Sequence, residues 1–146
     1  MLAQPKSLHY AATPLNEFTI QSNCEQMHKQ RYQLGHVYPL TRPYFDNTPR
    51  RDVSTAAILY PRGNKSATVE RIAQYFRNNV ETALRYQKCC NRVIGVKDAD
   101  KFIVVSSWNE WGEGLVLEPS DVFGNKFLDA IKQAKQKINI EMCDIN

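Results

Sequence analysis

Two stretches of the chain have the hydrophobic spacing of amphipathic helices. In residues 67–90, and again from about Gly124 to Ile138, apolar side chains recur every three or four positions and form one stripe. Ser66 is placed to cap the first helix, whose opposite, polar face we expect to meet solvent. The first stripe comprises Val69, Ile72, Ala73, Phe76, Val80, Ala83 and Leu84, the second Phe127, Leu128, Ile131, Ala134 and Ile138, and the polar face Glu70, Arg77, Glu81 and Lys88.

Two short apolar runs predict strands. Residues 102–105 are apolar without alternation, which is typical of a parallel strand covered on both sides, so we expect a buried strand over 102–107. Residues 36–40 predict a strand of four or five residues. The alternation of strands and helices favours an α/β fold with a parallel sheet. Of the rest, 1–14 and 52–65 are expected to be irregular, 15–33 to be loosely helical, and 41–51, rich in Pro, Asn and Asp, to be a loop.

Composition narrows the class of protein. The 146 residues suggest one domain, and no apolar run approaches the ~20 residues that a membrane helix needs, so no membrane span is expected. The net charge of +4 comes from scattered residues without a basic run, which argues against nucleic acid as a partner. Four cysteines without a Cys-x-x-Cys pattern predict no metal site and no cofactor. Free thiols and the absence of an apolar leader predict a cytoplasmic protein.

The densest chemistry directly follows the 102–107 run. Glu110 and Glu113 are three positions apart, and one helical turn would bring their Cβ atoms to ~5–6 Å, which suits retaining glycoside chemistry. Trp108 and Trp111 offer flat faces for a sugar ring, and Asn109 offers hydrogen bonds to a hydroxyl. The alternative is that the glutamates cap a helix or pair with arginines while the tryptophans fill the core. Residue types and spacing leave both interpretations open.

Two separate motifs resemble one known family. The first is Trp108-Asn109-Glu110-Trp111-Gly112-Glu113-Gly114 with Leu117-Glu118-Pro119 and Phe123-Gly124 after it, and the second is Phe45 followed by Asp46-Asn47-Thr48-Pro49-Arg50-Arg51. Both resemble segments of the WbsX-like glycosyltransferases, which are also described as glycoside hydrolase family 99-like. The resemblance implies the C-terminal portion of a (β/α)₈ TIM-like barrel that acts on carbohydrate in polysaccharide metabolism. A complete barrel takes ~250 residues, so the barrel would be incomplete.

The resemblance also implies roles for individual residues. Glu110 would be the base that deprotonates the sugar's 2-hydroxyl, and Glu113 the acid and then the base at the leaving oxygen. Transfer and hydrolysis both stay open. The substrate-binding candidates are Trp108, Asn109, Trp111, Asp46, Asn47, Arg50 and Arg51. For the second motif the alternatives are that it braces its loop, or that it is a plain turn in which Arg50 neutralises Asp46. Glu118 is expected at the mouth of the barrel rather than in catalysis.

The expected organisation is a single partial barrel domain over residues 1–146. Residues 1–35 form a poorly defined N-terminal segment without the family's aromatic strand motif, and 36–140 form the family-like part. Open sheet edges in a partial barrel favour self-association or a complementary chain. We therefore expect the isolated chain to be a poor enzyme. A non-catalytic carbohydrate-binding remnant of the same fold is the alternative function.

Overall fold

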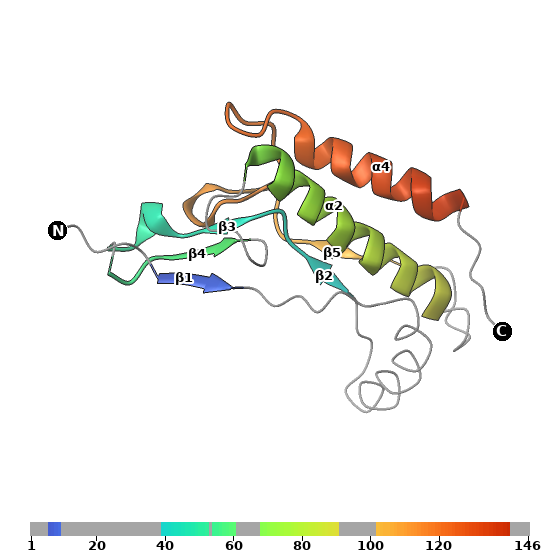
Figure 1. Cartoon of the computed structure of the whole chain (residues 1–146), viewed down its shortest axis with the longest axis horizontal. Coiled ribbons are helices and arrows are strands. Elements are labelled where there is room, and N and C mark those ends of the chain that lie inside the picture. The colour runs from blue at the N-terminus through green and yellow to red at the C-terminus, as the bar shows by residue number, and fades with distance from the viewer. Residues whose placement is uncertain (1–5, 10–38, 53, 61–67, 91–101, 141–146) are drawn as a thin grey trace.

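The computed structural model places two helices side by side over one face of several short strands (Figure 1). The chain is therefore mixed α/β, as expected. The structure describes residues 6–9, 39–52, 54–60, 68–90 and 102–140. The helix expected in 15–33 and the cap expected at Ser66 lie outside these ranges.

Helix α2 (Val69–Arg85) forms where the first apolar stripe predicts it. Thr68 is its N-cap, since the Thr68 hydroxyl accepts a hydrogen bond from the Arg71 N–H at 3.3 Å. The helix continues into a π-helical segment, Tyr86–Cys90. Five members of the predicted stripe are buried: Ile72, Ala73, Phe76, Val80 and Ala83.

Helix α4 (Lys126–Ile140) packs along α2 and completes the core. Phe76 meets Phe127 edge to face with 5.4 Å between the ring centroids, and Phe123 lies 4.6 Å from Phe127. Two cross-helix contacts, Arg77 with Gln133 and Glu81 with Lys137, both join positions 56 apart. The constant offset shows that the helices run parallel, as successive helices of an α/β fold do.

The polar face of α2 is not wholly in solvent, which corrects the sequence prediction. Glu81 is 7% exposed, because α4 lies alongside and brings Lys137 to its carboxylate. Lys88, expected on the same solvent face, donates to the carbonyl of Ile138 at 2.6 Å. A cation there suits the unpaired carbonyls at the end of α4.

A parallel pair of two-residue strands lies beneath the helices. Strand β2 (Leu40–Thr41) pairs with β5 (Val104–Val105), with Leu40 opposite Val104. Helix α2 connects these parallel strands and α4 follows β5, so β2, α2, β5 and α4 form a βαβα arrangement (Figure 1). The described part of the 36–40 run contributes only its last residue, Leu40, to a strand.

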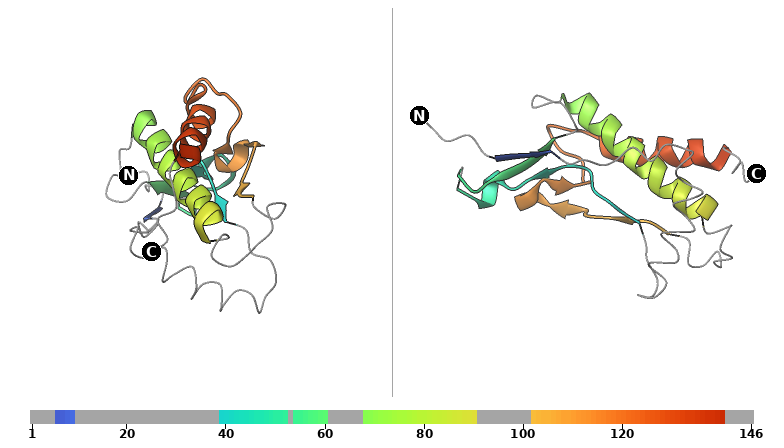
Figure 2. Two further views of the ribbon diagram at one scale, coloured as in Figure 1. Left: turned by 90° about the vertical axis from the view of Figure 1, so that its right-hand side faces the viewer. Right: turned by 60° about the horizontal axis from the view of Figure 1, so that its bottom comes forward.

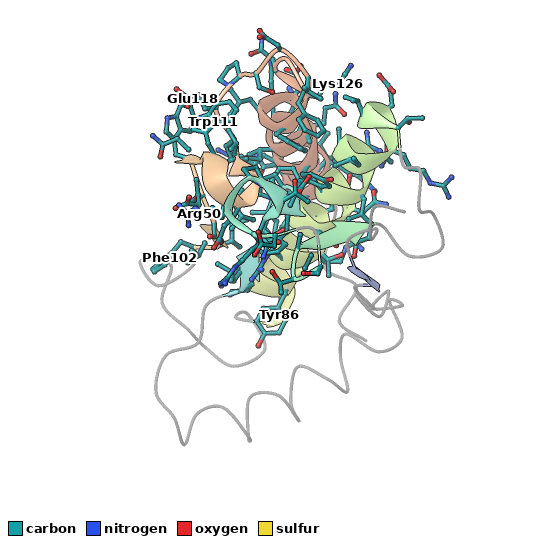
Figure 3. The ribbon with its side chains drawn as sticks, turned by 90° about the vertical axis from the view of Figure 1, so that its left-hand side faces the viewer. Arg50, Tyr86, Phe102, Trp111, Glu118 and Lys126 are labelled. Carbon is teal, nitrogen blue, oxygen red and sulfur yellow. The ribbon has the colours of Figure 1, made fainter. Side chains whose placement is uncertain are left out.

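The strand at 102–107 is parallel but is not covered on both sides, so the prediction of a buried strand is wrong. Ile103 and Val105 pack against the helical core, whereas Leu40 is 54% exposed and Val104 39% exposed. Phe102 also projects away from the helices (Figure 3). The apolar run predicts two buried faces, but in this chain the helices cover only one of them.

A second, three-stranded sheet occupies segments expected to be irregular. Its order is β1 (Lys6–His9), β4 (Ala57–Tyr60), β3 (Phe45–Asp46); β1 runs parallel and β3 antiparallel to β4. The sequence predicts irregular structure at 1–14 and 52–65 and a plain loop at 41–51. These predictions are wrong at β1, β4 and β3. The pairing partners lie up to 51 positions apart in sequence, as Lys6 with Ala57 shows, and local patterns do not reveal such partners.

The strands of the described ranges form three separate sheets. The β1–β4–β3 sheet is mixed and the β2–β5 pair is parallel, while the third sheet is an antiparallel pair within residues 109–116. Figure 2 shows the same arrangement from two further sides, with α2 and α4 together on one side of the strands. In the part of the chain described above, no helix is both long and apolar enough to cross a membrane.

Candidate active site

The two glutamates lie on a tight hairpin after β5. Strand β6 (Asn109–Glu110) pairs antiparallel with β7 (Leu115–Val116), and a 3₁₀ turn, Trp111–Glu113, joins them. Gly114 ends this turn with a φ of 63°, a left-handed conformation that glycine adopts without strain. Glu110 thus directly precedes this turn and Glu113 is its last residue.

Ser107 anchors the base of this hairpin. Its hydroxyl donates to the carbonyl of Leu115 at 2.8 Å and accepts from the N–H of Glu110 at 3.3 Å. In the sequence, Ser107 stands out only as a departure from the family pattern, which usually has apolar or small residues before the tryptophan, and this departure does not indicate an anchoring role. A hydroxyl at the end of a strand is suited to holding the following loop.

The second motif forms a 3₁₀ helix, Thr48–Arg50, held by its own side chains. The Asp46 carboxylate accepts a hydrogen bond from the Thr48 N–H at 2.9 Å. The Asn47 side-chain oxygen accepts from the Ala57 N–H at 2.6 Å. These contacts match the interpretation in which Asp46 and Asn47 brace the loop.

Arg50 connects the two motifs. Its Nη2 lies 2.6 Å from Glu110 Oε1, and its Nη1 lies 3.6 Å from Glu113 Oε1. The two motifs, sixty positions apart in sequence, therefore lie next to each other. The ion-pair partners of Arg50 are Glu110 and Glu113 and not Asp46, so the alternative in which Arg50 neutralises Asp46 is wrong. One guanidinium therefore lies beside both carboxylates.

Two glycines allow the loops to approach this closely. A Cβ atom on Gly112 would overlap the Arg50 side chain, with Cζ at 2.7 Å. A Cβ atom on Gly114 would lie 3.1 Å from the Asp46 backbone nitrogen and 3.3 Å from Tyr44 Cδ1. The glycines of the first motif therefore provide the room that the second motif occupies.

The alternative to a sugar site is correct for the glutamates, which pair with an arginine, Arg50. It is wrong for the tryptophans, which stay on the surface and do not fill the core. Trp108 and Trp111 are each 53% exposed. The Trp111 indole N–H donates to Glu118 Oε2 at 3.1 Å, which fixes one edge of the ring. Figure 3 shows Trp111, Glu118 and Arg50 on the same side of the molecule. An exposed aromatic face held by a polar edge is suited to stacking on an apolar sugar face.

The remaining candidates lie around this cluster. Asn109 is exposed on β6, and Arg51 is exposed directly after the 3₁₀ helix of the second motif. The Glu110 and Glu113 side chains are 39% and 37% exposed, so a ligand in solvent can reach both. Within the described ranges, no cluster of three or more His, Cys, Asp or Glu side chains could hold a metal ion.

Comparison with known proteins identifies the family. The sequence model of the WbsX glycosyltransferases matches residues 4–131. The chain belongs to the WbsX glycosyltransferase family. The match includes β1 and both motifs, so it extends well beyond the segments that carried the resemblance in the sequence.

Relatives and solved structures add two facts. The chain is 31% identical over 98 residues to the uncharacterized protein WxcX of Xanthomonas campestris pv. campestris, in strains B100 and ATCC 33913. The aligned region covers 67% of this chain and 12% of WxcX, so the chain spans a small part of these relatives. No solved structure matches the chain significantly.

Proposed function

We propose that this chain carries the carboxylate pair of a carbohydrate-active site that performs glycosyl transfer or glycoside hydrolysis. The observation that carries the proposal is the convergence of Glu110 and Glu113 on one guanidinium beside the exposed Trp111. Family membership supports a carbohydrate-related function. Two carboxyl groups held close together suit chemistry with retention at the anomeric carbon.

The proposed roles follow the order of the motif. Glu110 would take the proton of the sugar's 2-hydroxyl, whose oxygen then attacks the anomeric carbon. Glu113 would protonate the leaving oxygen as its bond to the anomeric carbon breaks. It would afterwards deprotonate the incoming hydroxyl, from water in hydrolysis or from an acceptor sugar in transfer. The incoming oxygen would displace the 2-oxygen from the anomeric carbon, and the 2-oxygen would take its proton back from Glu110. Trp108 and Trp111 would stack on the ring, with Asn109 and Arg51 beside it.

The proposed setting is part of a (β/α)₈ barrel. The β2–α2–β5–α4 arrangement has parallel strands and parallel helices, as two units of such a barrel do. Both motifs follow the carboxyl end of a strand in this pair, where barrel enzymes place their active sites. The exposed side chains of Leu40 and Val104 would then face further strands. Cytoplasmic localisation remains a prediction.

The test compares Glu110→Gln and Glu113→Gln with Asp129→Asn, an exposed acidic residue on α4 that serves as the control. Turnover of α-mannosides and rhamnosides would be measured, together with binding of the same sugars by calorimetry. We expect both glutamine variants to lose about 100-fold or more in turnover while sugar binding persists, since general acid–base groups contribute about 10²–10⁴-fold. Unchanged turnover in Glu113→Gln would contradict the proposal.

A non-catalytic carbohydrate-binding function is the second candidate. The observation that favours it is the pair of half-exposed tryptophans, which provides a sugar platform whether or not the glutamates react. Sugar binding without turnover in the unaltered chain, lost in Trp111→Leu and kept in Glu113→Gln, would select this function.

A further inference from the structure

Arg50 is the cation shared by the two glutamates, and its placement calls for a functional explanation. The Arg50 side chain is 53% exposed, and the two carboxylates are more than a third exposed. Ion pairs exposed to this extent contribute little to stability, about 0–1 kcal/mol. Stability of the fold therefore does not account for two acidic side chains directed at one arginine.

The identity of residue 112 points to the same arginine. Among the described glycines, Gly114 and Gly124 have a positive φ, and Gly112 does not. The backbone at position 112 is therefore open to other residues. A Cβ atom there would overlap the outer part of the Arg50 side chain at Nε, with Cζ at 2.7 Å and Cδ at 2.9 Å, so an alanine at this position requires the arginine to move aside. Gly112 thus makes room for the Arg50 side chain.

We propose that Arg50 is a positioning residue that holds Glu110 and Glu113 in their working geometry, and that Gly112 is required because the Arg50 side chain lies against it. This inference rests on the proposed function for the carboxylate pair. The guanidinium is planar, so Nη2 can hold one carboxylate while Nη1 faces the other. A lysine ammonium is a single point of charge and does not reproduce this fork.

The kinetic test is a double-mutant cycle between positions 50 and 112. Arg50→Ala and Gly112→Ala should each lower kcat by about 10- to 100-fold, since a displacement of about 1 Å in a catalytic group can cost 10²-fold. KM should change by less than about threefold, because a group that acts on the transition state changes kcat. The double variant should be no slower than Arg50→Ala, since without the arginine nothing lies where the new Cβ falls. Losses that multiply in the double variant would overturn the proposal.

Two further variants separate positioning from a structural role. Guanidinium ion added at millimolar concentration should restore part of the kcat of Arg50→Ala, and Arg50→Lys should stay as slow as Arg50→Ala. Lys132→Ala, which removes an exposed charge on α4, is the control and should keep wild-type kcat. Full activity in Arg50→Lys would show that a positive charge alone is sufficient. It would contradict the proposal that the two terminal nitrogens of the guanidinium each position one carboxylate.

A measurement without turnover distinguishes this inference from the proposed function. In ¹⁵N-edited NMR, an Arg50 guanidinium held by two carboxylates should give resolved Nη–H signals that Gly112→Ala and Glu110→Gln each abolish. If both variants abolish the Nη–H signals but the chain turns over no carbohydrate, the contact between Arg50 and the two glutamates is supported and the proposed catalytic function is contradicted. Signals unchanged in Gly112→Ala would overturn the positioning role whatever the activity.

Discussion

Lys137 of α4 donates a hydrogen bond to the buried carboxylate of Glu81 on α2, with 2.7 Å between Nζ and Oε2. Arg77 approaches the other oxygen of the same carboxylate, with Nε 3.3 Å from Oε1. A buried carboxylate is costly unless cations and hydrogen bonds compensate it. The parallel packing of the two helices thus includes one charged contact that depends on their register.

We expect Lys137→Met to lower the free energy of unfolding by about 1–2 kcal/mol, because it leaves the buried Glu81 carboxylate with one cation fewer. The measurement is urea denaturation followed by circular dichroism. Lys135→Met, an exposed position on the same helix, is the control and should change stability by less than about 0.5 kcal/mol. Equal effects at the two positions would show that the Glu81 contact contributes nothing specific.

Glu118 should affect sugar binding through Trp111. The Glu118→Leu variant removes the acceptor of the indole N–H and leaves the ring free to turn. An aromatic contact is worth about 0.5–1.5 kcal/mol, so we expect Trp111→Leu to weaken sugar affinity about 3- to 10-fold and Glu118→Leu by less. Glu118→Gln keeps an acceptor and should bind nearly as the wild type. Calorimetric titration measures all three, and tighter binding by Glu118→Leu would contradict this account.

Glu70 should make stability depend on pH. Its pKa lies below the ordinary value of 4.5, chiefly because a backbone hydrogen bond in the first turn of α2 favours the carboxylate, with Lys126 adding a smaller attraction. Since the folded state lowers the pKa, the stabilisation is present above pH 4.5 and is lost as the pH falls through the folded value.

The corresponding experiment compares Glu70→Gln with the wild type at pH 7 and at acidic pH. The variant should be less stable at pH 7, and the difference should shrink as the pH falls through the lowered pKa of Glu70 in the folded state. Lys126→Met removes the smaller attraction and should reduce the pH-dependent difference only in part. A difference of the same size at both values would show that Glu70 is not the titrating group.

The exposed side of the β2–β5 pair should promote association. Leu40, Phe102 and Val104 expose apolar side chains there, and Leu40 and Val104 are register partners. We expect concentration-dependent self-association in sedimentation velocity, weakened about tenfold or more in Leu40→Lys, since burying one leucine is worth about 1.5–3 kcal/mol. Val122→Thr, at an exposed loop position, is the control. A wild-type chain that stays monomeric at high concentration would exclude this role.

The two helices, and the placement of the two glutamates at one turn, were predictable from the sequence. The stripe at Ile72, Phe76 and Val80 was sufficient for α2, because amphipathic periodicity is local and a helix satisfies its own backbone hydrogen bonds. The glutamate pair was visible in the same way, since Glu110 and Glu113 lie three positions apart and any single turn brings them together. The family match supports the resemblance found in the two motifs.

The strands were harder to predict, because each two- or four-residue strand depends on a distant partner. Strand β1 has a polar sequence and forms against β4, and β3 lies within a segment whose composition is that of a loop. The burial of 102–107 was overestimated for a related reason. A continuous apolar run indicates surface that can be covered, whereas the neighbouring elements decide how much of it is covered.

The sequence by itself determined the two amphipathic helices, the two motifs and the carboxylate pair, because these depend on residues within one or two turns of each other. Only the tertiary structure decided that Arg50, sixty positions before Glu110, meets both glutamates, and that Gly112 makes room for it. It also decided that Glu81 is buried rather than solvated. Each of these depends on two segments distant in sequence packing together, and no local pattern specifies which distant side chain fills a given space.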